Sequence, residues 1–254
     1  ASVRAIAECA KRDGFTVRSV DQFGDVDLGE ASASVSIVSN WPDGILDAVR
    51  SLPNLPVIYG GALENSPELI DALAQERQIL GSSSEAVTAV RNPVHLQETL
   101  RQAGLPALEV AESLDNADRS LDWFLKPVSS AAGINARRID LTSIDSHLPK
   151  GRILQQFVSG RTLSGLYLVS ANGVQLLGMT EQLCGTPEAG ASGVLYSGSL
   201  APLSIRDVPP TCFECADKIG SVIGSTIGRS LRGLIGIDFI RDEQSGELWT
   251  LEVN

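Results

Sequence analysis

The chain has 254 residues, of which 43% are hydrophobic and only 5% aromatic, and its formal net charge is −11 at neutral pH. A chain of this length can bury a substantial core, as one large domain or as two to three small lobes. Its acidic balance argues against a general surface for nucleic acid or anionic membranes. No apolar stretch reaches the ~20 residues of a membrane-spanning helix, and the start has no signal-peptide layout, so a cytoplasmic location is expected.

The first 80 residues alternate between predicted helices and strands. Short connections between alternating strands and helices predict a parallel sheet that is covered on both faces. This part is therefore expected to be a Rossmann-like lobe, although it has no GxGxxG motif. Helices are predicted over 2–13, 44–51 and 67–75, and strands over 15–20, 33–38 and 56–59.

A helical bridge is predicted from residue 81 onward. Ser82 and Glu85 have the spacing of a capping box for a helix that ends near Val90, and a second helix is expected over 95–103. A strand then ends on Lys126, and the small residues of 128–135 follow it. Small residues let backbone N–H groups approach an anion closely, so this flexible loop is a candidate anion site.

The next part of the chain predicts a sheet and a long helix. A strand and turn are expected over 152–160, and a hairpin over 163–180 with Asn172-Gly173 at its turn. A helix is expected from Thr211 to about Ser230, with Gly220, Gly224 and Gly228 spaced four residues apart. The stretch is too short and too polar for a membrane dimerisation helix, so these glycines predict close packing on a sheet.

Two of the four cysteines, Cys212 and Cys215, form a single CxxC motif. A structural zinc site needs four ligands, and the sequence has neither a second pair nor a histidine beside this one. Thr211 and Glu214 have capping-box spacing, which places both thiols in the first turn of the helix. A packing role is therefore predicted for them.

The final predicted element is a hairpin. Apolar runs at 234–240 and 248–253 flank a polar, glycine-containing turn. A turn centred on Ser245 would place Asp238 opposite Glu252, and opposed residues share a face of the sheet.

Asn254 would lie on that same face through the period-2 alternation of the strand. Ile237, Phe239, Leu251 and Val253 would lie on the other face, which is expected to be buried.

Two carboxylates and a carboxamide on one face form an oxygen-only set of ligands. Asp238 and Glu252 at this distance need a cation, a shared proton or solvent. Together with Asn254 they suit a hard ion such as Mg²⁺, which usually binds substrate phosphates as well. The spacing leaves one alternative open, a surface hairpin whose acids are solvated.

The order of these parts resembles the ATP-grasp superfamily over essentially the whole chain, and within it the predicted ATP-dependent carboligase branch. The resemblance implies an α/β fold in three parts: a Rossmann-like lobe (1–80), a helical bridge with a small lid subdomain (81–154), and a C-terminal lobe with a mixed or antiparallel sheet and the Mg²⁺ site (155–254). It is carried by the Rossmann-like lobe, the strand ending on Lys126 with its loop, Leu-Gln-Gln-Phe-Val-Ser-Gly at 154–160, Gly-Ile-Asp-Phe-Ile at 236–240 and Leu-Glu-Val-Asn at 251–254.

Carried over by position, the resemblance assigns Lys126 to the nucleotide phosphates. It places Ser129, Ser130 and Gly133 in a mobile loop that closes over them. Arg91 falls where the family often has a basic residue near the triphosphate, or it is only a charge at a helix end. For Lys126 the alternative is a solvated lysine at the end of a strand.

The resemblance assigns the adenine to the strand around residues 155–158. The backbones of Gln156 and Val158 would hold it, with Gln155 as a side-chain contact, unless this is only a buried edge strand. Thr162 stands where many relatives have an acidic residue that reaches the ribose.

The resemblance assigns Mg²⁺, with Mn²⁺ as an alternative ion, to Asp238, Glu252 and Asn254. Relatives begin with a strand before Ala1 and continue past Asn254 with proline and arginine, so the chain is expected to be trimmed at both ends.

The implied activity is that of an ATP-dependent carboxylate–amine ligase, which forms C–N bonds through an acyl phosphate. Such chemistry needs no side-chain nucleophile, and no catalytic residue is assigned. The implied partners are ATP, a small carboxylate and an amine, in cofactor, pterin or amino-acid-conjugate biosynthesis; neither nucleic acid nor a membrane is implied, and a homodimer is compatible with the resemblance. The alternatives are an ATP-binding regulatory module without transfer activity and a carboxylase-type or kinase-type enzyme acting on another small acid.

Overall fold

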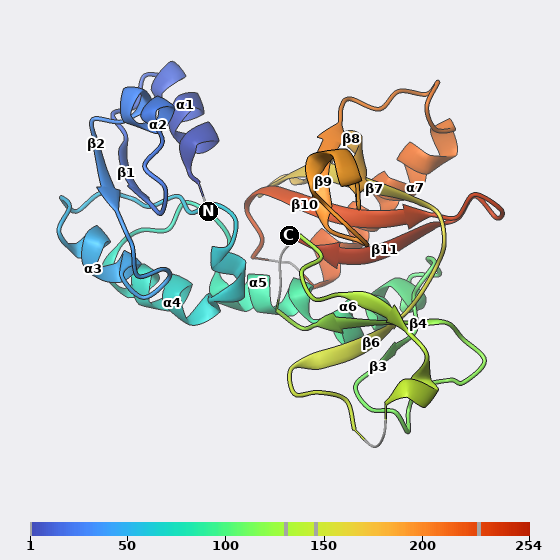
Figure 1. Cartoon of the computed structure of the whole chain (residues 1–254). Coiled ribbons are helices and arrows are strands. Elements are labelled where there is room, and N and C mark those ends of the chain that lie inside the picture. The colour runs from blue at the N-terminus through green and yellow to red at the C-terminus, as the bar shows by residue number, and fades with distance from the viewer. Residues whose placement is uncertain (1, 130–131, 145–146, 228–229) are drawn as a thin grey trace. The chain divides into compact units, whose positions relative to one another are not determined.

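The computed structural model describes residues 2–129, 132–144, 147–227 and 230–254 (Figure 1). The chain divides into two compact units, Ala1–Val87 and Thr88–Asn254. Within the described ranges, no helix has the length and apolar character needed to cross a membrane.

The first unit is built on a small parallel sheet. Its strands β1 and β2 pair in register from Arg18 opposite Ser34 to Asp21 opposite Ile37. The strand expected over 56–59 is wrong: only one parallel bridge forms there, between Val57 and Ile79. Pro56 has no N–H to extend the pairing. The elements of this unit are α1 (Arg4–Arg12), β1 (Arg18–Asp21), α2 (Val26–Ala31), β2 (Ser34–Ile37), α3 (Ile45–Arg50), a 3₁₀ turn (Leu63–Asn65) and α4 (Pro67–Glu76).

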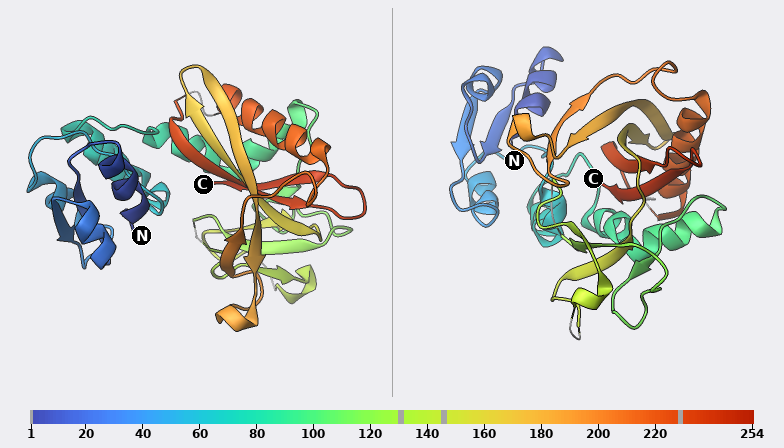
Figure 2. Two further views of the ribbon diagram at one scale, coloured as in Figure 1. Left: turned by 90° about the horizontal axis from the view of Figure 1, so that it is seen from above. Right: turned by 45° about the vertical axis from the view of Figure 1, so that its right-hand side comes forward.

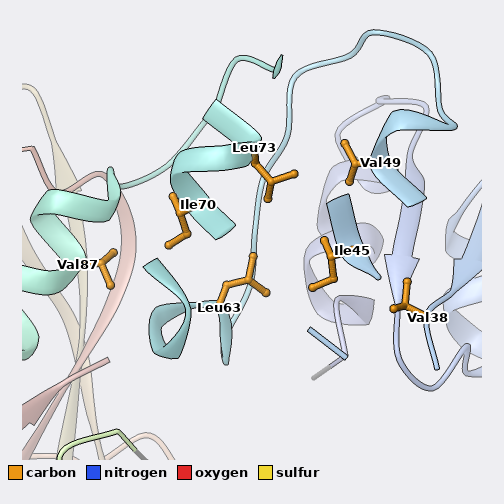
Figure 3. Packing of buried hydrophobic residues seen from close by; sticks show 7 residues of the cluster. All are labelled: Val38, Ile45, Val49, Leu63, Ile70, Leu73 and Val87. Carbon is orange, nitrogen blue, oxygen red and sulfur yellow. The ribbon is translucent and has the colours of Figure 1, made fainter. Parts of the chain in front are cut away.

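Helices cover both faces of this sheet, as predicted. Val35 packs on a small cluster formed by α1 and α2, whereas Val20, which points to the opposite face, packs on a larger cluster that includes α3 and α4. Figure 3 shows that larger cluster. Its buried members are Val38, Ile45, Val49, Leu63, Ile70, Leu73 and Val87.

The second unit begins within α5 (Ser84–Arg91), which is followed by α6 (Pro93–Gln102). At the N-terminal end of α5 the Ser83 hydroxyl accepts a helix N–H, that of Ala86, at 3.2 Å. A four-stranded antiparallel sheet in the order β3-β6-β4-β5 comes next. This sheet has a hydrophobic core of its own, which includes Trp123, Leu125 and Leu154. The strands are β3 (Val110–Ala111), β4 (Trp123–Pro127), β5 (Arg137–Ile139) and β6 (Arg152–Gln156).

A five-stranded antiparallel sheet forms the rest of this unit, in the order β11-β10-β7-β8-β9. One face is apolar, with Leu163, Tyr167 and Phe239 fully buried, and α7 (Pro210–Val222) packs along the sheet (Figure 2). Residues of the opposite parity, such as Ser164 and Asp238, lie on the other face. The strands are β7 (Arg161–Ser170), β8 (Gly173–Cys184), β9 (Tyr196–Leu200), β10 (Gly233–Arg241) and β11 (Leu248–Val253).

The glycines of α7 and of the short π-helix that follows it (Ile223–Ile227) bring this segment close to the sheet. A Cβ at Gly220 would come within 2.3 Å of the Tyr167 ring, and one at Gly224 would come within 2.2 Å of Val174. The predicted close packing is thus confirmed for these two positions, while Gly228 lies outside the described residues. The predicted cap is wrong, because the helix begins at Pro210 and its N-cap makes no side-chain hydrogen bond. Thr211 is already within the first turn.

Candidate functional site

The β10–β11 hairpin brings the two predicted acids together. Asp238 lies directly opposite Glu252, as predicted, and the backbones of Gly236 and Asn254 exchange hydrogen bonds of 2.8 and 2.7 Å. This pairing is confirmed as geometry, while the metal-binding role of the pair stays a prediction.

A bulge next to the acids corrects the predicted faces of β11. The register shifts between Asp238 and Phe239, so Phe239 lies opposite Thr250 and not opposite Leu251. Thr250 is fully buried in consequence, whereas Leu251 is only half-buried. A bulge inserts one extra residue in a strand, and this reverses the alternation of all residues beyond it.

Side chains from several elements donate hydrogen bonds to the two carboxylates. The two oxygens of Asp238 accept from Gln182 Nε2 at 2.9 Å and from Asn254 Nδ2 at 2.8 Å. Glu252 Oε2 accepts from Lys126 Nζ at 2.6 Å. Arg91 donates to Asn254 Oδ1 at 3.1 Å. The second unit therefore brings six polar side chains together, including the two carboxylates.

The two acids differ in their electrostatics. Burial raises the pKa of Asp238 to about 6, and the nearby charge of Glu252 adds to that effect. Burial also disfavours ionised Glu252, but the charge and hydrogen bond of Lys126 outweigh it and lower the pKa of that acid. The direct donors of Asp238, which are Ser164, Gln182 and Asn254, are all neutral, so this acid keeps an electrostatic need for a cation.

The residues present fit a hard divalent cation. Asp238, Glu252 and Asn254 supply carboxylate and amide oxygens, which are the ligands that Mg²⁺ prefers. Among the described residues, no group of three or more His, Cys, Asp and Glu side chains could hold a metal. Such an open set is typical of an ion that keeps several waters and binds substrate phosphates.

The loop behind Lys126 lies beside a small basic pocket. Ser129 lines a pocket of about 350 Å³ together with Lys150 and Arg152. Gly133 has a positive φ of 73°, and a Cβ there would come within 2.5 Å of the Val194 carbonyl oxygen. Ser130 lies outside the described residues, so its predicted role is a proposal only.

The predicted adenine strand ends with β6. Gln155 is buried, and its Nε2 donates to the Leu251 carbonyl at 3.1 Å. Gln156 pairs with Glu109 through its backbone N–H and through its side-chain oxygen, at 2.8 and 3.1 Å. Val158 is half-buried just beyond the strand. The structure thus gives Gln155 a protein partner, whereas its contact with adenine stays a prediction.

The contacts of two further residues with the hairpin were not predicted from the sequence. Gln182 of β8 reaches Asp238 across β7, and Gln97 of α6 donates to the Thr250 carbonyl of β11 at 2.8 Å. Neither lies in a motif. Gln182 could have been found only from the register of three strands, and the one sequence signal for Gln97 is its position on the inner side of a predicted helix.

Thr162, the predicted ribose contact, lies in β7 opposite Ile240. Its side chain hydrogen-bonds the Cys184 thiol, whose pKa is raised by burial. The structure therefore places Thr162 on the polar face of the five-stranded sheet, and its contact with ribose stays a proposal.

A family model described as an ATP-grasp domain matches residues 90–254. The chain belongs to the ATP-grasp family. No curated protein sequence matches it.

Solved structures of ATP-grasp proteins share this fold. The biotin carboxylase domain of 2-oxoglutarate carboxylase from Hydrogenobacter thermophilus, in complex with MgADP, ADP and bicarbonate, aligns with a TM-score of 0.75 and 14% identity over 99% of this chain and 61% of that one. N5-carboxyaminoimidazole ribonucleotide synthetase from Thermus thermophilus aligns with a TM-score of 0.72 and 16% identity, over 98% and 67% of the two chains. An ATP-grasp superfamily protein from Archaeoglobus fulgidus aligns with a TM-score of 0.62 and 14% identity, over 94% and 80%. The chain therefore spans about three fifths of the Hydrogenobacter domain.

Proposed function

We propose that this ATP-grasp protein is an ATP-dependent ligase that activates a small carboxylate and transfers it to an amine. The observation that supports this most is the pairing of Asp238 and Glu252 on adjacent strands, with Lys126 Nζ 2.6 Å from Glu252. A lysine and two carboxylates in one cluster are what a metal-bound triphosphate needs, because the acids hold the cation and the lysine binds phosphate oxygens.

Acidic and basic residues would have different roles in this site. Asp238, Glu252 and Asn254 would hold the cation, and Lys126 would leave Glu252 to contact the phosphates. When bound, Mg²⁺ supplies charge neutralisation and alignment of the triphosphate. Arg91 would keep the Asn254 side chain in place through the bond to its Oδ1.

The proposed reaction has two steps. A carboxylate oxygen of the substrate attacks the γ-phosphorus, and the bond to the β,γ-bridging oxygen breaks to release ADP. The amine nitrogen then attacks the acyl carbon, phosphate leaves with the C–O bonding electrons, and the amine loses a proton to phosphate or water. No side chain forms a covalent bond, so the contribution of the protein is positioning and charge stabilisation.

The test is ADP release with candidate acids and amines. The ligase is supported if ADP forms only when both a carboxylate and an amine are present. Release of ADP with bicarbonate alone would favour a carboxylase, because the biotin carboxylase domain from Hydrogenobacter thermophilus has a similar fold. Binding of ATP without any release would favour a regulatory module.

The metal pair has a separate test in Glu252→Gln. Loss of this charge should weaken binding of Mg-ATP by tenfold or more, on the order of 1.4 kcal/mol. Glu247→Gln is the matched control, because Glu247 lies exposed in the turn of the same hairpin. Equal affinities of the two variants would sink the assignment of the metal site.

A further inference from the structure

The strand that carries Glu252 is at the edge of its sheet. β11 pairs with β10 on one side only, so its outer carbonyls need partners other than a strand. Three outer carbonyls accept hydrogen bonds from side chains. The donors are Gln97 to Thr250 O at 2.8 Å, Gln155 to Leu251 O at 3.1 Å and Arg91 to Val253 O at 3.3 Å.

Two of these carbonyls belong to the bulge. Thr250 and Leu251 are consecutive residues, and consecutive carbonyls of a regular strand point to opposite edges. Here both accept from side chains, at the place where the register between β10 and β11 shifts. The bulge therefore depends on side-chain donors that a regular strand would not use.

Gln97 makes hydrogen bonds with both the nitrogen and the oxygen of its side-chain amide. It is only 2% exposed, its Nε2 donates to Thr250 O, and its Oε1 accepts from the Leu108 N–H at 2.8 Å. It thus ties β11 to the segment that leads into β3.

Gln155 approaches from the four-stranded sheet. It lies opposite Phe124 in the β4–β6 pairing, so it shares a face with Lys126 two residues along β4. Lys126 holds the Glu252 side chain, and Gln155 holds the carbonyl of the residue before it. One face of this sheet therefore contacts both the side chain and the backbone of the metal strand.

We propose that Gln97 and Gln155 are positioning residues of the metal site, acting on Glu252 through the backbone of β11. Phe239 pairs with Thr250 on the turn side of the bulge, so loss of the bulge would place Leu251 opposite Asp238 and turn Glu252 to the other face. The two amides hold the bulge and so aim Glu252 at Asp238. This inference rests on the proposed function.

The test uses Gln97→Met and Gln155→Met in the full chain. Methionine has a similar length and no amide, so it removes the donated hydrogen bond at little change in volume. Mn²⁺ titrations of the protein–ATP complex by electron paramagnetic resonance give the metal affinity, and calorimetry in EDTA gives the metal-free ATP affinity. Gln175→Met, at an exposed position on β8, is the control.

We expect each variant to weaken Mn²⁺ binding about three- to tenfold, and Gln97→Met to leave metal-free ATP binding unchanged. A purely structural role would lower the melting temperature and reduce both affinities alike, which would overturn the inference. For Gln155→Met, a selective loss of metal-free ATP binding would identify an adenine contact instead and would overturn its positioning role. Unchanged Mn²⁺ binding would overturn both assignments.

The controls separate this inference from the proposed function. Wild-type protein without metal-dependent ATP binding would refute the proposed function itself. If the wild type binds ATP in a metal-dependent way and both variants bind Mn²⁺ as tightly as the wild type, only the positioning roles are refuted. Should Gln97→Met fail to fold, Gln155→Met carries the same test.

Discussion

At the scale of single residues, Lys126 has a role even without nucleotide. Its ammonium group neutralises Glu252 at 2.6 Å, so it occupies electrostatically the place that a cation would take. We predict that Lys126→Met will bind free Mn²⁺ more tightly than the wild type, because the positive charge that repels the cation is gone. It should bind Mg-ATP more weakly, because the same charge would attract the phosphates. Calorimetric titrations with Mn²⁺ alone and with Mg-ATP measure the two effects.

Lys218→Met is the control for that prediction, since Lys218 is exposed on α7. It should leave both affinities unchanged. If Lys126→Met lowered the affinities for Mn²⁺ and for Mg-ATP together, its lysine would support the fold of the site and would not compete with the metal.

The close approach of Gly220 to Tyr167 predicts that a side chain at this position destabilises the fold. A methyl group there would enter the ring of Tyr167, which is fully buried and donates to the Ala216 carbonyl at 2.8 Å. We expect Gly220→Ala to lower the free energy of unfolding by roughly 1–3 kcal/mol, as overpacking does. Urea denaturation followed by circular dichroism measures the change.

Gly178→Ala is the matched control, because a Cβ at this position of β8 meets nothing within 4 Å. Its effect should be small or slightly stabilising, since alanine restricts the unfolded chain. Equal losses in the two variants would show that the contact with Tyr167 does not decide the stability of this helix.

Residues with a local pattern could be predicted, and residues that act across elements could not. Asp238 and Glu252 were placed opposite each other from turn composition and alternation alone, and the structure has them so. Leu251 was assigned to the wrong face, because nothing in the sequence marks a bulge. Gln97 was missed because an amide on a helix gives no sign that it will meet a carbonyl of a distant strand.

At the scale of elements, the packing of α7 decides the reactivity of the CxxC pair, of which Cys212 lies in the first turn of the helix and Cys215, contrary to the prediction, in the second. Cys212 is buried and Cys215 half-buried, and burial raises the pKa of both thiols. The thiolate is the reactive form, so both should react slowly at neutral pH. Burial raises the pKa of Cys184 as well, whereas Cys9 is exposed on α1.

We therefore predict that Ellman's reagent will modify one thiol per native chain rapidly at pH 7.4, and all four after denaturation. Cys9→Ser should abolish the rapid phase. The rate of the slow phase should rise with pH, because a raised pKa delays formation of the thiolate. Rapid modification in Cys9→Ser would show that Cys184 or a thiol of α7 is readily accessible, which would contradict the prediction.

The elements that were predicted well have strong local signals. The Asn172-Gly173 turn and the apolar run of β10 need no distant partner to be recognised. The strand expected over 56–59 failed because a strand exists only through its neighbour, and the pairing with Ile79 extends over a single bridge. Register and pairing are tertiary properties.

At the scale of the whole molecule, the chain divides at residue 87, inside α5. The Rossmann-like lobe was predicted to end at residue 80, close to this boundary. The further division of the later residues into a lid subdomain and a C-terminal lobe stays a prediction. Lys126 and Gln155 of the four-stranded sheet contact β11 of the five-stranded sheet, which is why the second unit contains both sheets.

This division predicts where Mg-ATP will protect the chain from hydrogen exchange. The described candidate ligands all belong to Thr88–Asn254. Ligand at a hundred times its dissociation constant stabilises a folded unit by about 2.7 kcal/mol, which slows exchange through its opening roughly a hundredfold. We expect the largest protection in peptides from β4, β6, β10 and β11, measured by mass spectrometry with Mg-ATP.

ATP in EDTA is the control, and it should protect the β10–β11 hairpin far less than β4 and β6, because only the metal joins the hairpin acids to the phosphates. Protection concentrated in residues 1–87 would contradict the location of the site. Equal protection of the hairpin with and without metal would leave the nucleotide site in the second unit but remove Asp238 and Glu252 from it, since their contact with the triphosphate is through the cation alone.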